Sequence, residues 1–157
     1  MSWAQRLFGF EGGTDTEVHA ALEEVHVHLL GQVRRLRDVA GLAPTAAAET
    51  ELRSLAQEDE ALAAELREQL LAGGSPGPGS GQAEADAPVS GLNHWARLVG
   101  VLDQHRATRD LLLSTTARAR EIAPDLGVLC ERLSHAEETH LTRLRGLVAT
   151  ADPQALD

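Results

Sequence analysis

The sequence predicts an all-α protein, a four-helix bundle built from two helical hairpins joined by a long flexible connector. In four long segments apolar residues recur at spacings of three and four, and Gly and Pro separate these segments. The 157 residues include two Trp, two Phe and no Tyr, so Leu, Val and Ala must fill the core, as they do in packed helices. A chain of this length is about one domain and can bury one core without disulfides.

The first hairpin is predicted at residues 14–73, after a short amphipathic segment at residues 1–13. Thr14 or Asp15 is expected to cap its first helix, and Thr45 to cap its second. Both helices end at Gly-containing stop signals.

Residues 74–89 are rich in Gly, Pro and Ser and carry no packable pattern, which predicts the flexible connector. The second hairpin is predicted at residues 90–150, with Ser90 as its first cap and a break at Ala123–Pro124. The residues predicted on the inward face of its first helix are Leu92, Trp95, Val99, Leu102, His105, Arg109, Leu112 and Thr116. Residues 151–157 form a tail. The connector is long enough either to run the length of the bundle or to make a slack turn, so both topologies are open.

Composition excludes several classes of function. A net charge of −10 argues against nucleic acid as a partner, because phosphates would be repelled by most of the surface. The single cysteine, Cys130, excludes a disulfide framework and a Cys-rich metal module. No signal peptide opens the chain and no apolar run approaches ~18 residues, so we expect a cytoplasmic protein without a membrane span.

A Glu-x-x-His unit, Glu137 to His140, falls on the apolar stripe of the last predicted helix. That stripe reads Leu126, Leu129, Leu133, Glu137, His140, Leu144 and Leu147. A buried carboxylate beside a buried imidazole needs partners, and a metal ion satisfies both. The unit therefore predicts a metal site, and an ordinary buried ion pair is the plain alternative.

Polar residues also interrupt the other three stripes near the middle of each helix. Helix middles stay level in either topology, so these residues are expected to converge at one depth. The predicted metal ligands are His26, Asp59, His105, Glu137 and His140. Mixed imidazole and carboxylate ligands suit iron, zinc, manganese or copper and disfavour calcium or magnesium. In the plain alternative Asp59 forms a salt bridge with Arg109 at the facing position, while His135 is expected at the surface.

The stretch Val101–Ala149 resembles the second half of a rubrerythrin-type, ferritin-like domain. The resemblance rests on an inward residue, a short break, and then Leu-x-x-x-Glu-x-x-His-Leu-x-x-Leu-Arg at Leu133–Arg145. Residues 16–73 resemble the first half of such a domain more weakly.

In that family two glutamates and two Glu-x-x-His units hold a di-iron centre that reduces peroxide or oxidises ferrous iron. Glu137 and His140 match one unit. The positions that depart from the family's ligands are His26 and His105 in place of glutamates, Asp59 in place of the second-helix glutamate, and Leu62 in place of its histidine. The resemblance implies a ferritin-like protein that stores, senses or oxidises a transition metal, with iron the expected ion, and leaves catalysis open.

A competing hypothesis is a non-catalytic helical interaction or scaffold module with a relic metal site. Its support is the segment 1–10, whose Trp3, Leu7, Phe8 and Phe10 could dock on a protein partner, a sister subunit or a membrane surface, although so short a segment is a weak membrane anchor. Four leucines that lie off the predicted stripes separately predict a homo-oligomer. They are Leu30, Leu71, Leu111 and Leu113.

Overall fold

The structure is a computed structural model that describes residues 11–73 and 92–152. It is all-helical over these ranges, which confirms the predicted four-helix bundle. The helices are α2 (Glu11–Gly41), α3 (Ala46–Ala72), α4 (His94–Ile122) and α5 (Pro124–Ala151). The predicted segment before residue 11, the connector and the end of the tail lie outside the described residues.

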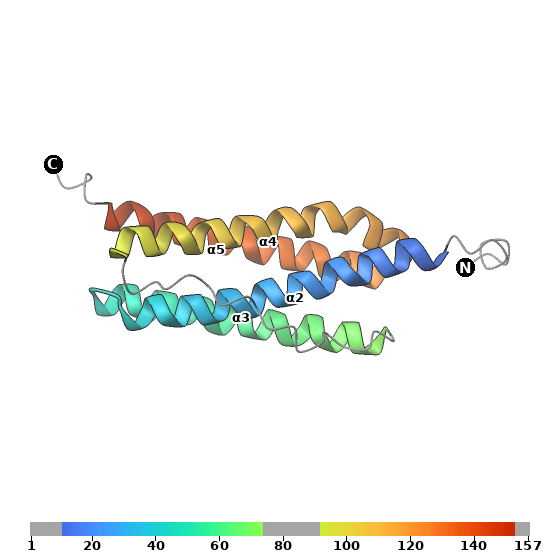
Figure 1. Cartoon of the computed structure of the whole chain (residues 1–157), viewed down its shortest axis with the longest axis horizontal. Helices are drawn as coiled ribbons and strands as arrows, with labels where there is room; N and C mark the ends of the chain where they lie inside the picture. The colour runs from blue at the N-terminus through green and yellow to red at the C-terminus, as the bar shows by residue number, and fades with distance from the viewer. Residues whose placement is uncertain (1–10, 74–91, 153–157) are drawn as a thin grey trace.

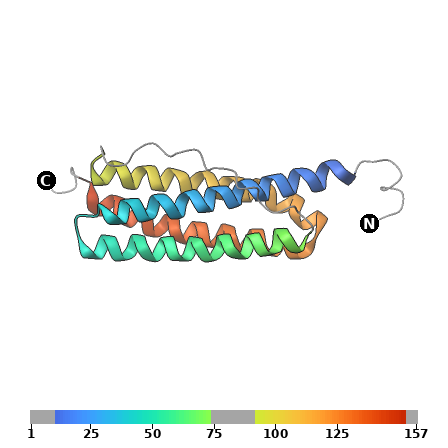
Figure 2. The ribbon, with the colours of Figure 1, turned by 60° about the horizontal axis from the view of Figure 1, so that its bottom comes forward.

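The arrangement of the helices distinguishes between the two topologies that the sequence left open, a connection along the bundle and a turn at one end. The helices α2 and α3 pack together in opposite directions, as do α4 and α5, and α2 also packs along α4 (Figures 1 and 2). The end of α3 and the start of α4 lie at opposite ends of the bundle (Figure 2). The link between them therefore connects the two ends of the bundle, and α3 and α4 run in the same direction.

The core consists of two apolar clusters with a polar layer between them. One cluster contains Leu29, Ala63 and Leu112, and the other contains Leu36, Ala56 and Leu102. Each helix passes from one cluster to the other through buried polar residues, which are Gln32, Asp59, His105, Thr108, Glu137 and His140. The position of this layer is what brings polar side chains from all four helices to one depth.

The observed helix starts confirm one predicted cap and correct two. Thr45 caps α3, because its Oγ1 accepts a hydrogen bond from the Ala48 N–H at 3.2 Å. The cap of α4 is Asn93 rather than Ser90, and its Oδ1 accepts from the Ala96 N–H at 2.8 Å. Helix α2 begins at Glu11, earlier than the predicted Thr14 or Asp15. Gly12 and Gly13 lower helix propensity, but their backbone stays helical and α2 continues through them.

The inward face of α4 differs from the predicted one by about one residue. Leu92 and Trp95 were expected inside but are 41% and 37% exposed. Thr108 and Thr115 are buried in place of the predicted neighbours Arg109 and Thr116. The Thr115 hydroxyl donates to the Leu111 carbonyl one turn earlier in α4, and the Thr108 hydroxyl lies close to both the Gln104 carbonyl and Gln32 Oε1 of α2, so both buried hydroxyls have an acceptor within reach.

Gly127 allows α5 to pack closely on the end of α4. A Cβ atom at Gly127 would lie 2.8 Å from Arg120 Cβ and 2.9 Å from Arg120 Cα, whereas a Cβ at Gly146 would meet nothing within 4 Å. We expect Gly127→Ala to lower the free energy of unfolding by ~1–3 kcal/mol through overpacking. The matched variant Gly146→Ala, also in α5, is expected to raise it by up to ~1 kcal/mol. Urea denaturation of both variants checks this, and equal shifts would contradict the close approach.

Candidate metal centre

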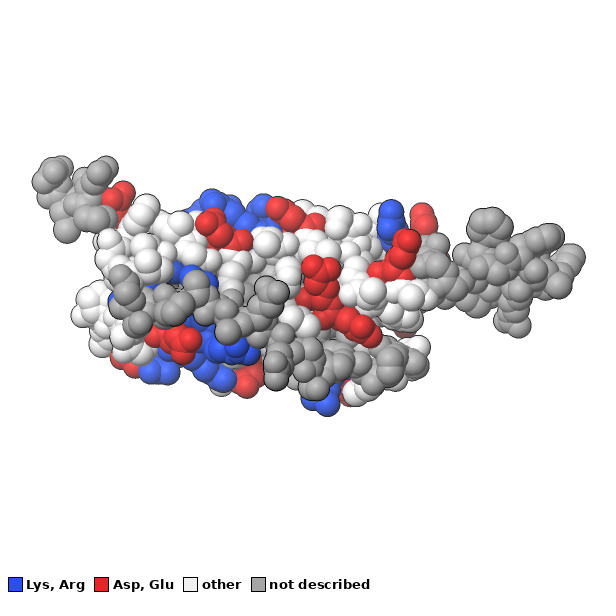
Figure 3. Space-filling view, in the orientation of Figure 1, with Lys and Arg blue, Asp and Glu red and all other residues white. Residues whose placement is uncertain are grey.

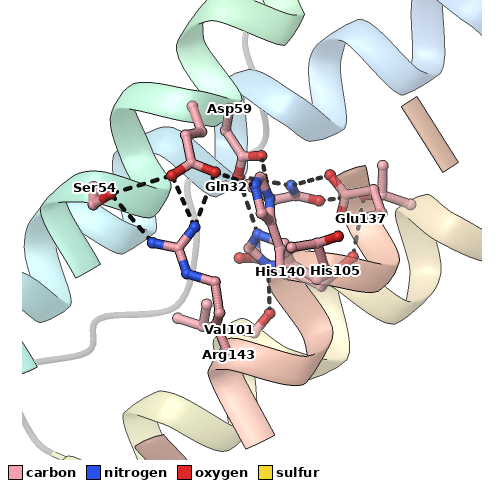
Figure 4. Close-up of polar contacts among 12 residues, drawn as sticks. Gln32, Ser54, Asp59, Val101, His105, Glu137, His140 and Arg143 are labelled. Atoms are coloured by element: carbon pink, nitrogen blue, oxygen red, sulfur yellow. Dashed lines mark hydrogen bonds and ion pairs between the residues drawn. The ribbon is translucent and has the colours of Figure 1, made fainter. Parts of the chain in front are cut away.

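Four of the five predicted ligands meet in the polar layer. Asp59 comes from α3, His105 from α4, and Glu137 and His140 from α5, and Figure 4 shows these side chains directed toward one another. One ligand atom from each lies within 4.8 Å of all the others. The four side chains are at most 2% exposed. This buried His and carboxylate cluster could hold a metal ion.

The His105 ring is held by a hydrogen bond on its outer side. Its Nδ1 donates to the Val101 carbonyl at 2.9 Å, one turn earlier in α4. Because a carbonyl only accepts, this bond places a proton on Nδ1 and directs Nε2 inward, 3.0 Å from Asp59 Oδ2. Metal-binding histidines in proteins are commonly oriented in this way.

His140 repeats this arrangement from α5. Its Nε2 donates to Glu58 Oε2 at 2.9 Å, and its Nδ1 faces inward, 3.0 Å from Asp59 Oδ1. The inner contact is close, but its orientation does not make a hydrogen bond. A ring nitrogen and a carboxylate oxygen both present lone pairs, so this contact requires a proton or another cation nearby.

Gln32 on α2 joins the two carboxylates. Its amide Nε2 donates to Asp59 Oδ2 at 3.1 Å and to Glu137 Oε1 at 3.2 Å. The hydroxyl of Thr108 on α4 donates to Gln32 Oε1 and thereby fixes the direction of the amide. Each carboxylate thus has one oxygen bound to Gln32 and a second oxygen that faces the centre.

Three buried atoms at this centre have no hydrogen-bond partner. They are Asp59 Oδ1, Glu137 Oε2 and His140 Nδ1. Leaving a buried polar atom unpaired typically costs ~1–3 kcal/mol, and more when the group is charged. Because the three atoms belong to facing side chains, a single cation could interact with all of them.

The two carboxyl groups titrate in opposite directions. Burial opposes the charged form of Asp59, but the hydrogen bond from His105 and the close contact with His140 outweigh it and lower the pKa of Asp59 to about 2. Burial dominates at Glu137 and raises its pKa to about 7, with the Asp59 charge acting in the same direction. A proton therefore occupies Glu137 over much of the range below neutral pH.

Both imidazoles favour their protonated form when no metal is bound. Burial alone would lower the pKa of His105, but its hydrogen bond to Asp59 and the charge of Glu137 raise it overall. Burial is likewise outweighed at His140, where contacts with Asp59 and Glu137 raise the pKa. Protons on these rings occupy the positions that a metal ion would take.

The fifth predicted ligand, His26, lies outside this group. It is buried and lines a different pocket, of about 370 Å³, between α2 and α3. Burial and the charge of Arg67 lower its pKa. The midpoint of α2 is not level with that of α3, because α2 begins beyond the end of α3, where His19 lies close to Gly73. The α2 residue at the level of the cluster is therefore Gln32.

Two residues around the cluster, Gln32 and Arg143, were not predicted from the sequence. Gln32 lies three residues after Leu29 on the buried stripe of α2, a signal that could have identified it. Arg143, which binds Glu58, lies three residues after His140 and had no such signal. The predicted Asp59 partner Arg109 instead binds Glu138 at 2.9 Å near the surface.

The residues present fit a divalent transition metal. Two carboxylates and two neutral imidazoles carry a charge of −2, which neutralises one divalent ion and avoids an uncompensated buried charge. This donor set suits iron, zinc or manganese rather than calcium. A metal bound here supplies Lewis acidity or redox chemistry.

The face of the molecule in Figure 3 shows no large patch of a single charge. On the face in Figure 3, basic and acidic side chains are interspersed rather than separated into patches of one sign. Among the described helices, none has the length and apolar character needed to cross a membrane. The chain matches no protein-family model, no curated protein and no solved structure.

Proposed function

We propose that this protein is a ferritin-like metal-binding bundle that holds one divalent transition metal ion, with Asp59, His105, Glu137 and His140 as ligands. The observation that carries the proposal is the set of three buried atoms that make no hydrogen bond at the centre of the cluster. The fixed outer hydrogen bonds of both histidines support it, because they leave the inner nitrogens free to bind a metal.

The ferritin-like assignment rests on the Glu-x-x-His unit and on the path of the chain. Ferritin-like bundles contain one long crossover connection, and α3 and α4 here are joined across the length of the bundle. By this resemblance iron is the expected ion. The charge balance favours Fe²⁺ over Fe³⁺, and it favours one ion over two, because either alternative would leave excess positive charge in the core.

The closed geometry supports binding, storage or sensing of the ion itself. All four ligand residues are at most 2% exposed, so an organic substrate has no contact with them in this conformation. Oxidation of the bound ion by a small oxidant stays compatible with this geometry. Chemistry on a larger substrate would require the helices to separate.

A metal analysis of protein purified without chelator tests the proposal. We expect about one equivalent of iron, zinc or manganese per chain, or uptake of one equivalent when Fe²⁺ is added without oxygen. Mass spectrometry with inductively coupled plasma gives the stoichiometry. Two equivalents would contradict a mononuclear site.

An interaction module is the second candidate function, and exposed leucines favour it. Leu30, Leu71 and Leu113 are 44%, 49% and 57% exposed, and two of them border the His26 pocket. They suit a partner helix or a second copy of the chain. Protein that contains no metal and takes up none would favour this candidate over the metal-binding function.

A further inference from the structure

Among the four proposed ligands, His140 is the one with a described hydrogen bond to an exposed side chain. Asp59 and Glu137 are bound by Gln32, and His105 donates to the Val101 carbonyl, all within the core. His140 instead donates to Glu58, whose side chain is 44% exposed. The pair Glu58–His140 therefore provides a hydrogen-bonded connection between the centre and solvent.

Arg143 covers this connection from α5. Its guanidinium donates to both carboxylate oxygens of Glu58, at 2.8 and 2.9 Å, and its Nε donates to Glu51. Its second terminal nitrogen donates to Ser54 at 3.2 Å (Figure 4). A cationic group thus occupies the space between two carboxylates directly outside a proposed metal ligand.

We propose that metal exchange takes place past Glu58 and His140, and that Arg143 keeps this route closed. This inference rests on the proposed metal-binding function. When Arg143 swings into solvent, Glu51 and Glu58 lose their cation and become available to an arriving divalent ion. Glu58 also becomes free to release the outer nitrogen of His140, so that the ring can turn between the surface and the centre.

The kinetics of zinc exchange in Arg143→Gln test this route. Zn²⁺ suits the measurement because it has no redox chemistry. Stopped-flow mixing of loaded protein with excess chelator gives the release rate, and mixing of metal-free protein with Zn²⁺ gives the uptake rate. We expect both rates to rise about tenfold, as the loss of charge-assisted hydrogen bonds lowers the opening barrier. The dissociation constant should stay within about threefold, since Arg143 contacts none of the four ligands.

Arg109→Gln is the matched control. Arg109 is 22% exposed against 25% for Arg143, and its carboxylate partners Asp110 and Glu138 do not contact the centre. Its exchange rates are expected to equal those of the wild type. Arg143→Lys keeps the charge but loses the two-pronged contact, so its rates should fall between those of wild type and Arg143→Gln.

The outcomes separate this route from the metal site itself. Zinc binding by the wild type with equal exchange rates in Arg143→Gln and Arg109→Gln would overturn the route and leave the metal site intact. Failure of the wild type to bind zinc, iron or manganese would overturn the metal site, and the route with it. Faster uptake and release in Arg143→Gln alone would support both.

Discussion

Metal ion at a hundredfold excess over the dissociation constant is expected to raise the free energy of unfolding of the wild type by ~3 kcal/mol. For a bundle of this size the corresponding rise in melting temperature is roughly 10 °C. His140→Ala is expected to show almost no rise, because it removes one ligand and leaves Asp59 Oδ1 without its facing nitrogen. Thermal melts with and without Fe²⁺ or Zn²⁺ measure this difference.

Each variant is compared with and without metal, so that the loss of stability caused by the substitution itself cancels. His140→Ala also leaves a cavity that destabilises the metal-free protein, but the metal-dependent rise is a difference within the same variant. His135→Ala is the control on the same helix, since His135 is exposed and outside the cluster. If His140→Ala and wild type gain equal stability from metal, the ion binds elsewhere and the Glu-x-x-His unit is an ordinary polar core pair.

The sequence predicted the bundle and most of the centre for one physical reason. A polar side chain on an apolar stripe is costly unless it is paired, so Asp59, His105, Glu137 and His140 stood out against their Leu neighbours. The breaks before α3 and α5 could also be identified from the sequence, because Thr45 and Pro124 are residues typical of the start of a helix. The positions of the four residues near the middles of the helices, which stay level in either topology, then predicted that they lie at one depth.

The contribution of α2 could not be predicted from periodicity alone. The α2 residue that lies beside Asp59 depends on how far α2 extends past the end of α3. This offset between the two helices is set by their packing. His26 and Gln32 are both buried on α2, and the offset between α2 and α3 places Gln32, rather than His26, beside the cluster. An amide also gives a weaker sequence signal than an imidazole, although here it orients both carboxylates.

The face of α4 was ambiguous for a different reason. Leu102, His105 and Leu112 belong to both the predicted and the observed stripe, so either rotation of the helix satisfied the pattern. The observed rotation buries Thr108 and exposes the charge of Arg109 to Glu138. A buried threonine can bind a backbone carbonyl of its own helix, which offsets the cost of burying its hydroxyl. Hydrophobic periodicity gives no sign of this bond.

Replacing Glu137 with glutamine is expected to stabilise the metal-free protein while it removes metal binding. The carboxyl pKa rises from 4.5 to about 7 in the folded state, so the charged form of Glu137 opposes folding above neutral pH. Glutamine keeps the shape and can still accept the hydrogen bond from Gln32. At pH 8 we expect Glu137→Gln to be more stable than wild type by ~1–3 kcal/mol, with no metal-dependent gain.

The pH dependence of the wild type checks the same group without a mutation. The raised pKa values of Glu137, His105 and His140 increase the free energy of unfolding at low pH. This stabilisation is complete below about pH 4.5 for Glu137 and below about pH 6.5 for the two histidines. This contribution is lost as the pH rises through the folded-state pKa values. The lowered pKa of Asp59 acts at the other end, since its contribution is lost only as the pH falls toward 2.

Metal-free protein is therefore expected to lose stability as the pH rises from about 5 to 8, whereas the metal-dependent gain should grow over the same range. The gain grows because a metal ion must displace the protons on His105, His140 and Glu137, and fewer of these protons remain at higher pH. Urea denaturation at each pH, with and without Zn²⁺, measures both trends. Metal-free Glu137→Gln that is less stable than wild type at pH 8 would mean that the charged carboxylate is an ordinary stabilising ion pair, and the buried cluster would then need no metal.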